Sequence, residues 1–102
     1  MSNCSELTIY KVKKENIKRV IELSLSIIAE INENETVITS HKILQKTDNE
    51  EELCWHLTWV NEKAVQQYTE KWSDLPSANE LMSLVDAKLY SGSTVRYHRS
   101  LR

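Results

Sequence analysis

The chain has 102 residues, of which 40% are hydrophobic and 27% are charged, and these values are ordinary for one soluble globular domain. Its formal net charge of −2 gives no reason to expect nucleic acid as a partner, because nucleic-acid binding normally requires a clustered basic surface. Gly92 is the only glycine, which excludes phosphate-binding loops, dinucleotide fingerprints and the Gly-x-Ser-x-Gly elbow of serine hydrolases, since each needs at least two glycines.

The amino terminus and the two cysteines predict a cytoplasmic protein. Residues 1–6 have neither the basic start nor the apolar run of a secretion signal, and charged residues interrupt the apolar stretch 17–31, so no membrane association is expected. Without a secretion signal, two cysteines indicate reduced thiols. We expect Cys4, in a terminal segment, to react quickly, Cys54 to be protected in a packed strand, and no disulfide to join them.

The first two predicted elements are a strand and a long helix. Residues 7–13 are rich in β-branched and aromatic side chains, which is typical of a strand. From residue 15 the apolar positions recur at steps of three and four, which predicts one face of a helix that ends at residues 32–35. That face consists of Ile17, Val20, Ile21, Ser24, Ile27, Ile28 and Ile31, and Leu23 and Leu25 widen it.

Two strands follow, at residues 36–46 and 53–60, separated by a polar turn. The second of them is the clearest strand in the chain. One face presents Leu53, Trp55, Leu57 and Trp59, and the other presents Cys54, His56, Thr58 and Val60. Neither face carries a fixed charge at neutral pH, so this strand is expected to be covered on both sides.

A second helix and a last strand complete the chain. Asn61 is a suitable N-cap for a helix whose apolar side holds Ala64, Val65, Tyr68 and Trp72. Leu75 and Pro76 interrupt this helix. Ser77 and Glu80 have the spacing of a capping box, which predicts that the helix restarts with Leu81, Leu84 and Val85 pointing inward. Gly92 is expected to mark a bend before a strand at residues 93–99.

This order of elements predicts a single α+β domain over residues 1–102, with its core at about 7–99. The pattern is the ferredoxin-like β-α-β-β-α-β arrangement, a four-stranded antiparallel sheet with helices on one face. Because those helices cover only one face, the second uncharged face of strand 53–60 needs another cover. A second copy of the chain is the simplest one, so we expect a homodimer.

The segment from Trp59 to Lys71 is a strand ending in tryptophan, a short polar cap and a helix that contains alanine, and it resembles the antibiotic biosynthesis monooxygenase superfamily. The element order agrees over residues 7–99. The resemblance implies a dimeric α/β barrel, in which two sheets pack face to face and ligand cavities lie between sheet and helices. It leaves several activities open, because the superfamily includes cofactor-independent quinone-forming oxygenases, haem-degrading enzymes and proteins of unknown reaction.

The haem-degrading members are the less suitable model for this chain. They use an asparagine on the first strand with a tryptophan and a histidine on the second helix. The residues near those positions here are Thr8 or Tyr10, then Tyr68, then Ala78 or Asn79. Neither predicted helix contains a histidine to ligate haem iron, so we expect no haem and no other cofactor.

The candidate catalytic residues are His56 and Tyr10, either of which could assist proton removal from a substrate. Tyr68 and Trp72 lie four residues apart on one helix face and could form a wall of an aromatic pocket. Each has a more ordinary alternative, a hydrogen-bonded core histidine for His56 and simple core packing for the aromatic pair.

Two other groups of residues are candidates for a metal site and for a catalytic pair, and neither is expected to be one. His41, His56 and His98 lie on three different predicted strands without the paired spacing of metal ligands, so no metal site is expected. Cys54 and His56 share a strand face but lack a third orienting group for a thiolate–imidazole pair.

Three functions remain. The first is a cofactor-independent monooxygenase-like enzyme for a small aromatic or quinol-type substrate, as the resemblance implies. The second is a non-catalytic protein that binds a small ligand, and the third is a structural or stress-type dimer.

Overall fold

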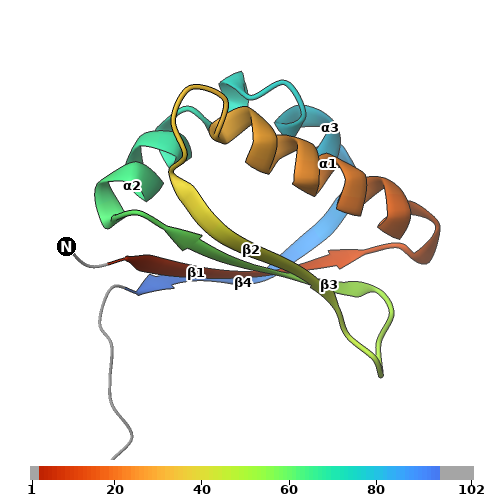
Figure 1. The fold of residues 1–102 in the computed structure, drawn as a ribbon. Helices are drawn as coiled ribbons and strands as arrows, with labels where there is room; N and C mark the ends of the chain where they lie inside the picture. Colours follow the sequence, from red (N-terminus) through yellow and green to blue (C-terminus); the bar gives the residue numbers. More distant parts are fainter. Residues whose placement is uncertain (1–2, 95–102) are drawn as a thin grey trace, which may run out of the picture.

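The computed structural model describes residues 3–94, which form a four-stranded antiparallel sheet with helices on one face (Figure 1). The strands lie side by side in the order β2-β3-β1-β4. The predicted ferredoxin-like fold is therefore confirmed. In chain order the elements are β1 (Cys4–Val12), η1 (Lys14–Asn16), α1 (Ile17–Ile31), β2 (Ile38–Gln45), β3 (Glu52–Trp59), α2 (Glu62–Glu70), η2 (Trp72–Asp74), α3 (Ala78–Leu84) and β4 (Val85–Thr94).

The last strand begins earlier than the sequence predicts. Helix α3 ends at Leu84, and Val85 already pairs with Val12 at the end of β1. The expectation that Val85 continues the helix is therefore wrong, because pairing with a central strand overrides the local helical spacing. Gly92 lies inside β4 opposite Leu7 and marks no bend at the start of a strand. Residues 95–99 of the predicted strand lie outside the described residues.

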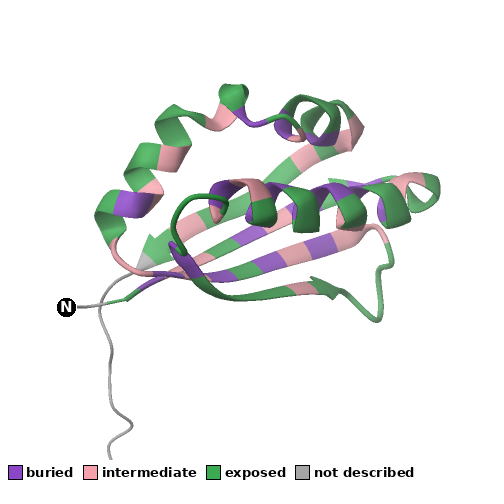
Figure 2. Cartoon of the chain, turned by 45° about the horizontal axis from the view of Figure 1, so that its top comes forward, coloured by how far each residue is buried: buried purple, intermediate pink, exposed green. Residues whose placement is uncertain are grey.

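The core lies between the sheet and the helices, and strict alternation along the two central strands builds it. Every second residue of β1 and β3 points toward the helices, and Figure 2 shows these buried positions as bands along the strands. Helix α1 supplies the facing surface. Its buried residues are Ile17, Val20, Leu23, Ser24, Ile27, Ile28 and Ile31. Leu25 is 45% exposed, so the prediction that it widens the buried stripe is wrong.

The opposite face of the sheet, which we call the outer face, has no helix over it among residues 3–94 (Figure 1). It presents the alternate residues of the same strands. Several are apolar and accessible, with exposed fractions of 38% for Leu7, 50% for Leu44 and 52% for Tyr90. Ile9 and Cys54 are half-buried beside them. Accessible apolar side chains gathered on one face of a sheet are typical of a face that another molecule covers.

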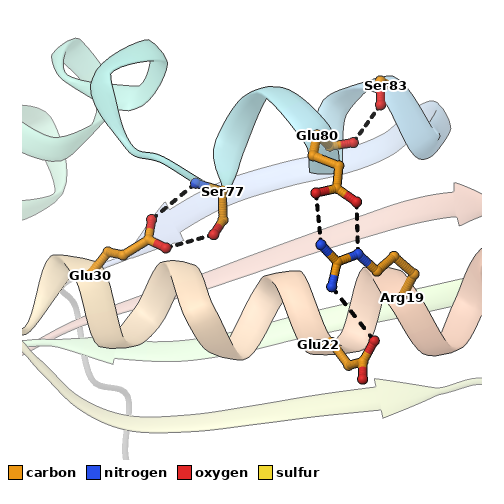
Figure 3. Close-up of polar contacts among 6 residues, drawn as sticks. All are labelled: Arg19, Glu22, Glu30, Ser77, Glu80 and Ser83. Carbon is orange, nitrogen blue, oxygen red and sulfur yellow. Dashed lines mark hydrogen bonds and ion pairs between the residues drawn. The ribbon is translucent and has the colours of Figure 1, made fainter.

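Of the two predicted helix caps, one is confirmed and one is wrong. The Asn61 side chain accepts a hydrogen bond from the Ala64 amide at 2.8 Å, as expected for an N-cap. Ser77 makes no capping hydrogen bond to α3. Its hydroxyl instead donates to Glu30 at 2.6 Å, and Glu80 pairs with Arg19, so both residues of the supposed capping box bind α1 (Figure 3).

These contacts fasten the segment that contains α3 to helix α1 at two points (Figure 3). Glu30 accepts hydrogen bonds from the backbone amide and the hydroxyl of Ser77. Arg19 donates two hydrogen bonds to Glu80, at 2.7 and 2.8 Å, and they hold the pKa of that carboxyl below its usual value. A bidentate pair fixes geometry better than a single contact does, so α1 and α3 are held in register above the sheet.

The predicted order of thiol reactivity is reversed in the structure. Cys4 is fully buried, because β1 begins at Cys4 and its side chain points toward the helices. Cys54 is half-buried on the outer face, and burial raises the pKa of its thiol. We expect Cys54 to react before Cys4 when the native protein is titrated with a thiol reagent and the labelled peptides are identified by mass spectrometry. Faster labelling of Cys4 would contradict the position of β1.

No helix among the described residues is long and apolar enough to cross a membrane.

Candidate functional site

A cavity of about 350 Å³ lies between the sheet and the helical layer. Its floor comes from β1, β3 and β4, and its walls come from α1, α2, η2 and α3. This volume lies within the range of small-molecule sites. Its lining is mostly apolar, and the aromatic members are Tyr10, Trp55, Trp59, Tyr68 and Trp72.

The five rings form two adjoining groups. Tyr10 meets Trp55 edge to face, with ring centroids 5.4 Å apart, and Trp55 lies 6.1 Å from Trp72. Trp59 and Tyr68 form the second group at 6.0 Å. These separations are typical of favourable ring pairs, so the aromatic walls hold one another in place. An aromatic ligand between them would meet ring faces or edges on several sides.

Trp55 is anchored by a buried hydrogen bond as well as by packing. Its indole nitrogen donates to the Ser24 hydroxyl at 2.9 Å, and that hydroxyl donates to the Val20 carbonyl at 2.7 Å. The serine on the buried face of α1 thus satisfies the polar atom of the tryptophan. These two hydrogen bonds connect Trp55, on the cavity floor, to helix α1.

Glu6 is the acidic residue that lines the cavity. One carboxylate oxygen accepts a hydrogen bond from the Trp59 indole at 2.9 Å, and the other accepts one from the Thr8 hydroxyl at 3.3 Å. Thr8 is also 3.5 Å from the hydroxyl of Ser91 on β4. The carboxylate is therefore held in a defined position in a half-buried site, where a negative charge has a larger effect than in water.

Tyr10 contributes a phenolic hydroxyl to the cavity. The residue is 3% exposed and lines the cavity, yet no described residue forms a hydrogen bond with its hydroxyl. Burial raises the pKa of Tyr10 well above its usual value, and the charge of Glu6 raises it further. The hydroxyl therefore remains protonated at neutral pH. It can therefore donate a hydrogen bond to a ligand.

The remaining polar lining comes from the edge strand β4. Lys88 lies opposite Tyr10 and Ser91 lies opposite Thr8, so both point toward the helical side. Both side chains are exposed and both line the cavity. The cavity is thus apolar and aromatic between α1 and α2, and polar along the β4 edge.

The predicted site residues are divided between the two faces of the sheet. Tyr10, Tyr68 and Trp72 line the cavity. His56 is exposed on the outer face, because it alternates with the buried Trp55 and Leu57. A polar contact from His56 to a ligand between sheet and helices does not fit this position, since the sheet itself separates the two.

The other histidines do not gather around the cavity either. His41 is exposed on the edge strand β2, and His98 lies outside the described residues. Among residues 3–94 no group of three potential metal ligands comes together.

The sequence did not lead to Glu6 or Lys88, and it pointed to Thr8 only at the position of the asparagine of the haem-degrading members. The predicted first strand began at residue 7, one position after Glu6. Alternation back from Tyr10 would have placed Thr8 and Glu6 on the same inward face, and a charge on an inward face is a useful signal of a site. Lys88 had no such signal, because residues before Gly92 were assigned to the region between helix and strand.

No family model matches the chain, and no curated relative matches it. Solved structures do resemble it along almost its whole length. An antibiotic biosynthesis monooxygenase family protein from Caulobacter crescentus superposes with a TM-score of 0.78 at 9% identity, over 95% of this chain and 92% of that one. SnoaB, a cofactor-independent oxygenase from Streptomyces nogalater, gives a TM-score of 0.66 at 13% identity, over 99% and 97% of the two chains. A dimeric ferredoxin-like protein from an uncultured marine organism gives 0.71 at 7% identity, over 100% and 94%.

At these identities the likeness establishes a shared fold. The resemblance inferred from the segment Trp59–Lys71 is thereby confirmed at the level of the fold. Chemistry does not follow from the fold, because one scaffold serves many activities. It has to be argued from the cavity.

Proposed function

We propose that the protein is a cofactor-independent monooxygenase-like enzyme that oxidises a small fused-ring phenol or quinol-type substrate in this cavity. The observation that carries the proposal is the pairing of a fixed carboxylate, Glu6, with a protonated hydroxyl, Tyr10, inside aromatic walls. An aromatic substrate would stack on the rings, with its hydroxyl near these two groups. SnoaB, which shares the fold, is a cofactor-independent oxygenase, and this supports the reaction class.

The reaction balances without an added reductant. A phenol with a free para position loses its hydroxyl proton and reacts with O₂ at the para carbon. One oxygen atom becomes the new carbonyl oxygen, and the ring carbon loses its hydrogen. The second oxygen atom leaves as water with the two hydrogens that the substrate has lost, so the substrate supplies all four electrons that O₂ accepts.

The two polar residues have complementary roles in this scheme. Glu6 accepts the proton of the substrate hydroxyl, since its carboxylate is already held by the Trp59 indole and the Thr8 hydroxyl. Tyr10 donates a hydrogen bond to the developing oxyanion, which is worth most in a site shielded from water. The aromatic walls exclude water around the ionised substrate.

The test uses 1-naphthol as substrate in air, with a chelator and no added metal or flavin. We expect oxygen uptake and formation of a naphthoquinone that carries one atom of label from ¹⁸O₂. Tyr10→Phe should lower kcat about a hundredfold, because one hydrogen-bond donor to the oxyanion is lost. Tyr90→Phe, the same change on the outer face, is the matched control and should keep wild-type turnover.

His56→Gln separates the two candidates that the sequence proposed. If Tyr10 and Glu6 carry the reaction, this variant retains turnover, because His56 lies on the other face of the sheet. Loss of turnover in His56→Gln with normal turnover in Tyr10→Phe would overturn the assignment.

A non-catalytic ligand-binding function is the second candidate. It is favoured by one observation, that both oxygens of Glu6 already accept hydrogen bonds and so are partly occupied. In that case 1-naphthol binds without oxygen uptake. If the protein only binds ligands, Glu6→Gln leaves the affinity for 1-naphthol nearly unchanged. If the protein is an enzyme, the same substitution abolishes turnover of 1-naphthol.

We also propose that the protein is a homodimer that pairs through its outer face. The apolar side chains Leu7, Ile9, Leu44 and Tyr90 support this, together with a hollow of about 280 Å³ beside Ile9, Leu44 and Cys54 that a partner side chain could fill. One protein of the same fold is itself a dimeric ferredoxin-like protein. A self-complementary sheet face suits a twofold interface.

A further inference from the structure

Lys88 is a cation on the cavity lining that takes part in no ion pair with the described residues. Among residues 3–94 no carboxylate forms an ion pair with its ammonium group, although five ion pairs form elsewhere on the surface. The chain as a whole carries a net charge of −2, so this cation does not reflect a basic composition.

Glu6 does not neutralise Lys88, although both line the cavity. Lys88 lies opposite Tyr10, and Glu6 is four residues earlier on β1, opposite Ser93. Four residues of a strand separate the two Cα positions by about 13 Å, whereas the Tyr10 side chain brings its hydroxyl close enough to Glu6 for that charge to raise its pKa. In addition, both carboxylate oxygens of Glu6 are engaged by Trp59 and Thr8. The cavity therefore has a negative group and a positive group toward different ends.

This arrangement suits a ligand with two unlike ends. A neutral hydroxyl can donate to Glu6, whereas an anionic group there would be repelled by the carboxylate. An anionic group near Lys88 would gain an opposite charge, and the exposed hydroxyl of Ser91 on the same strand face could donate to it. The aromatic walls between the two ends select a flat, apolar middle.

We propose that the site takes an aromatic acid, a phenol whose ring system carries a carboxylate, and that Lys88 is the residue that selects the carboxylate. The inference rests on the proposed function, because it concerns the ligand of the same cavity. Lys88 acts on binding and lies outside the proton-transfer pair of Glu6 and Tyr10. Its removal should therefore lower the affinity for the acid much more than that for the neutral phenol.

The test compares two probes that differ by one group, 5-hydroxy-1-naphthoate and 1-naphthol. Binding is measured by isothermal titration calorimetry with the wild-type protein, Lys88→Gln and Lys18→Gln. Lys18 lies exposed on α1 and, among the described residues, makes no ion pair, so its variant changes the net charge equally without touching the cavity.

We expect the wild type to bind the naphthoate about fivefold more tightly than 1-naphthol, since an exposed ion pair contributes a modest free energy. Lys88→Gln should reduce the ratio of the two affinities to about one, and Lys18→Gln should keep the wild-type preference. Raised ionic strength should weaken the preference in the wild type, because salt screens an exposed pair.

The remaining outcomes overturn one proposal or the other. Equal affinities for the two probes in the wild type overturn the role of Lys88 and leave the cavity function standing. An equal loss of preference in Lys18→Gln and Lys88→Gln also overturns it, because net charge alone would then explain the effect. If 1-naphthol itself does not bind to the wild type, both the proposed function and the role of Lys88 are overturned.

Discussion

Replacing Trp55 with alanine is expected to lower the free energy of unfolding by about 3–5 kcal/mol, the usual cost of deleting a buried tryptophan. The ring is 3% exposed, packs against Tyr10 and Trp72, and donates the buried hydrogen bond to Ser24. Urea denaturation followed by circular dichroism measures the effect. All variants should be compared at one protein concentration, since an associating protein gains apparent stability by mass action.

Two smaller changes separate the causes of this loss. Ser24→Ala removes the hydroxyl that accepts from the Trp55 indole and donates to the Val20 carbonyl, and it leaves the indole donor buried, which should cost about 1–3 kcal/mol. Trp72→Ala removes a ring of the same size that is only half-buried, so its cost should be lower than that of Trp55→Ala. A Trp55→Ala variant as stable as Trp72→Ala would contradict the central position of Trp55.

The sequence predicted the fold well because two periodic signals agree with the final packing. Alternation in strand 53–60 and the three- and four-residue steps of helix 17–31 both reflect burial against one common core. The same alternation already separated His56 from Trp55. It could not show which face meets the helices, because neither face carries a fixed charge.

The errors occurred where distant residues decide the local structure. Ser77 and Glu80 match a capping box. Ser77 instead donates its hydrogen bond to Glu30, 47 residues away in sequence, and Glu80 accepts hydrogen bonds from Arg19, 61 residues away. Val85 has helical spacing, yet Val12 pairs with it in the sheet. Such partners are brought near only by the tertiary fold, so a local pattern cannot reveal them.

The cavity could be predicted only in part for the same reason. The sequence places Tyr68 and Trp72 on one face of a single helix, and both do line the cavity, although α2 ends at Glu70 and Trp72 belongs to η2. Glu6 and Lys88 lie on the first and last strands, and only the pairing of β1 with β4 brings both to one cavity. The polar groups that would decide a ligand are thus set by topology more than by any local motif.

Replacing Leu7 with glutamate is expected to convert the proposed dimer into a monomer at micromolar concentration. Leu7 lies on the outer face of the central strand β1 and is 38% exposed. In a twofold interface the substitution buries two carboxylates among the apolar side chains of this face, which should weaken association about a hundredfold or more. Sedimentation velocity measures the change, and far-UV circular dichroism shows whether the subunit remains folded.

Leu25→Glu provides the matched control, because Leu25 is a leucine of similar exposure, 45%, on the solvent side of α1. It should sediment as the wild-type dimer does. Covering of the outer face also predicts that Cys54 is labelled faster in the Leu7→Glu monomer than in the dimer, since Cys54 lies on that face. If the folded wild-type protein sediments as a monomer, or if both leucine variants remain dimers, the outer face is not the interface and its apolar side chains need another partner.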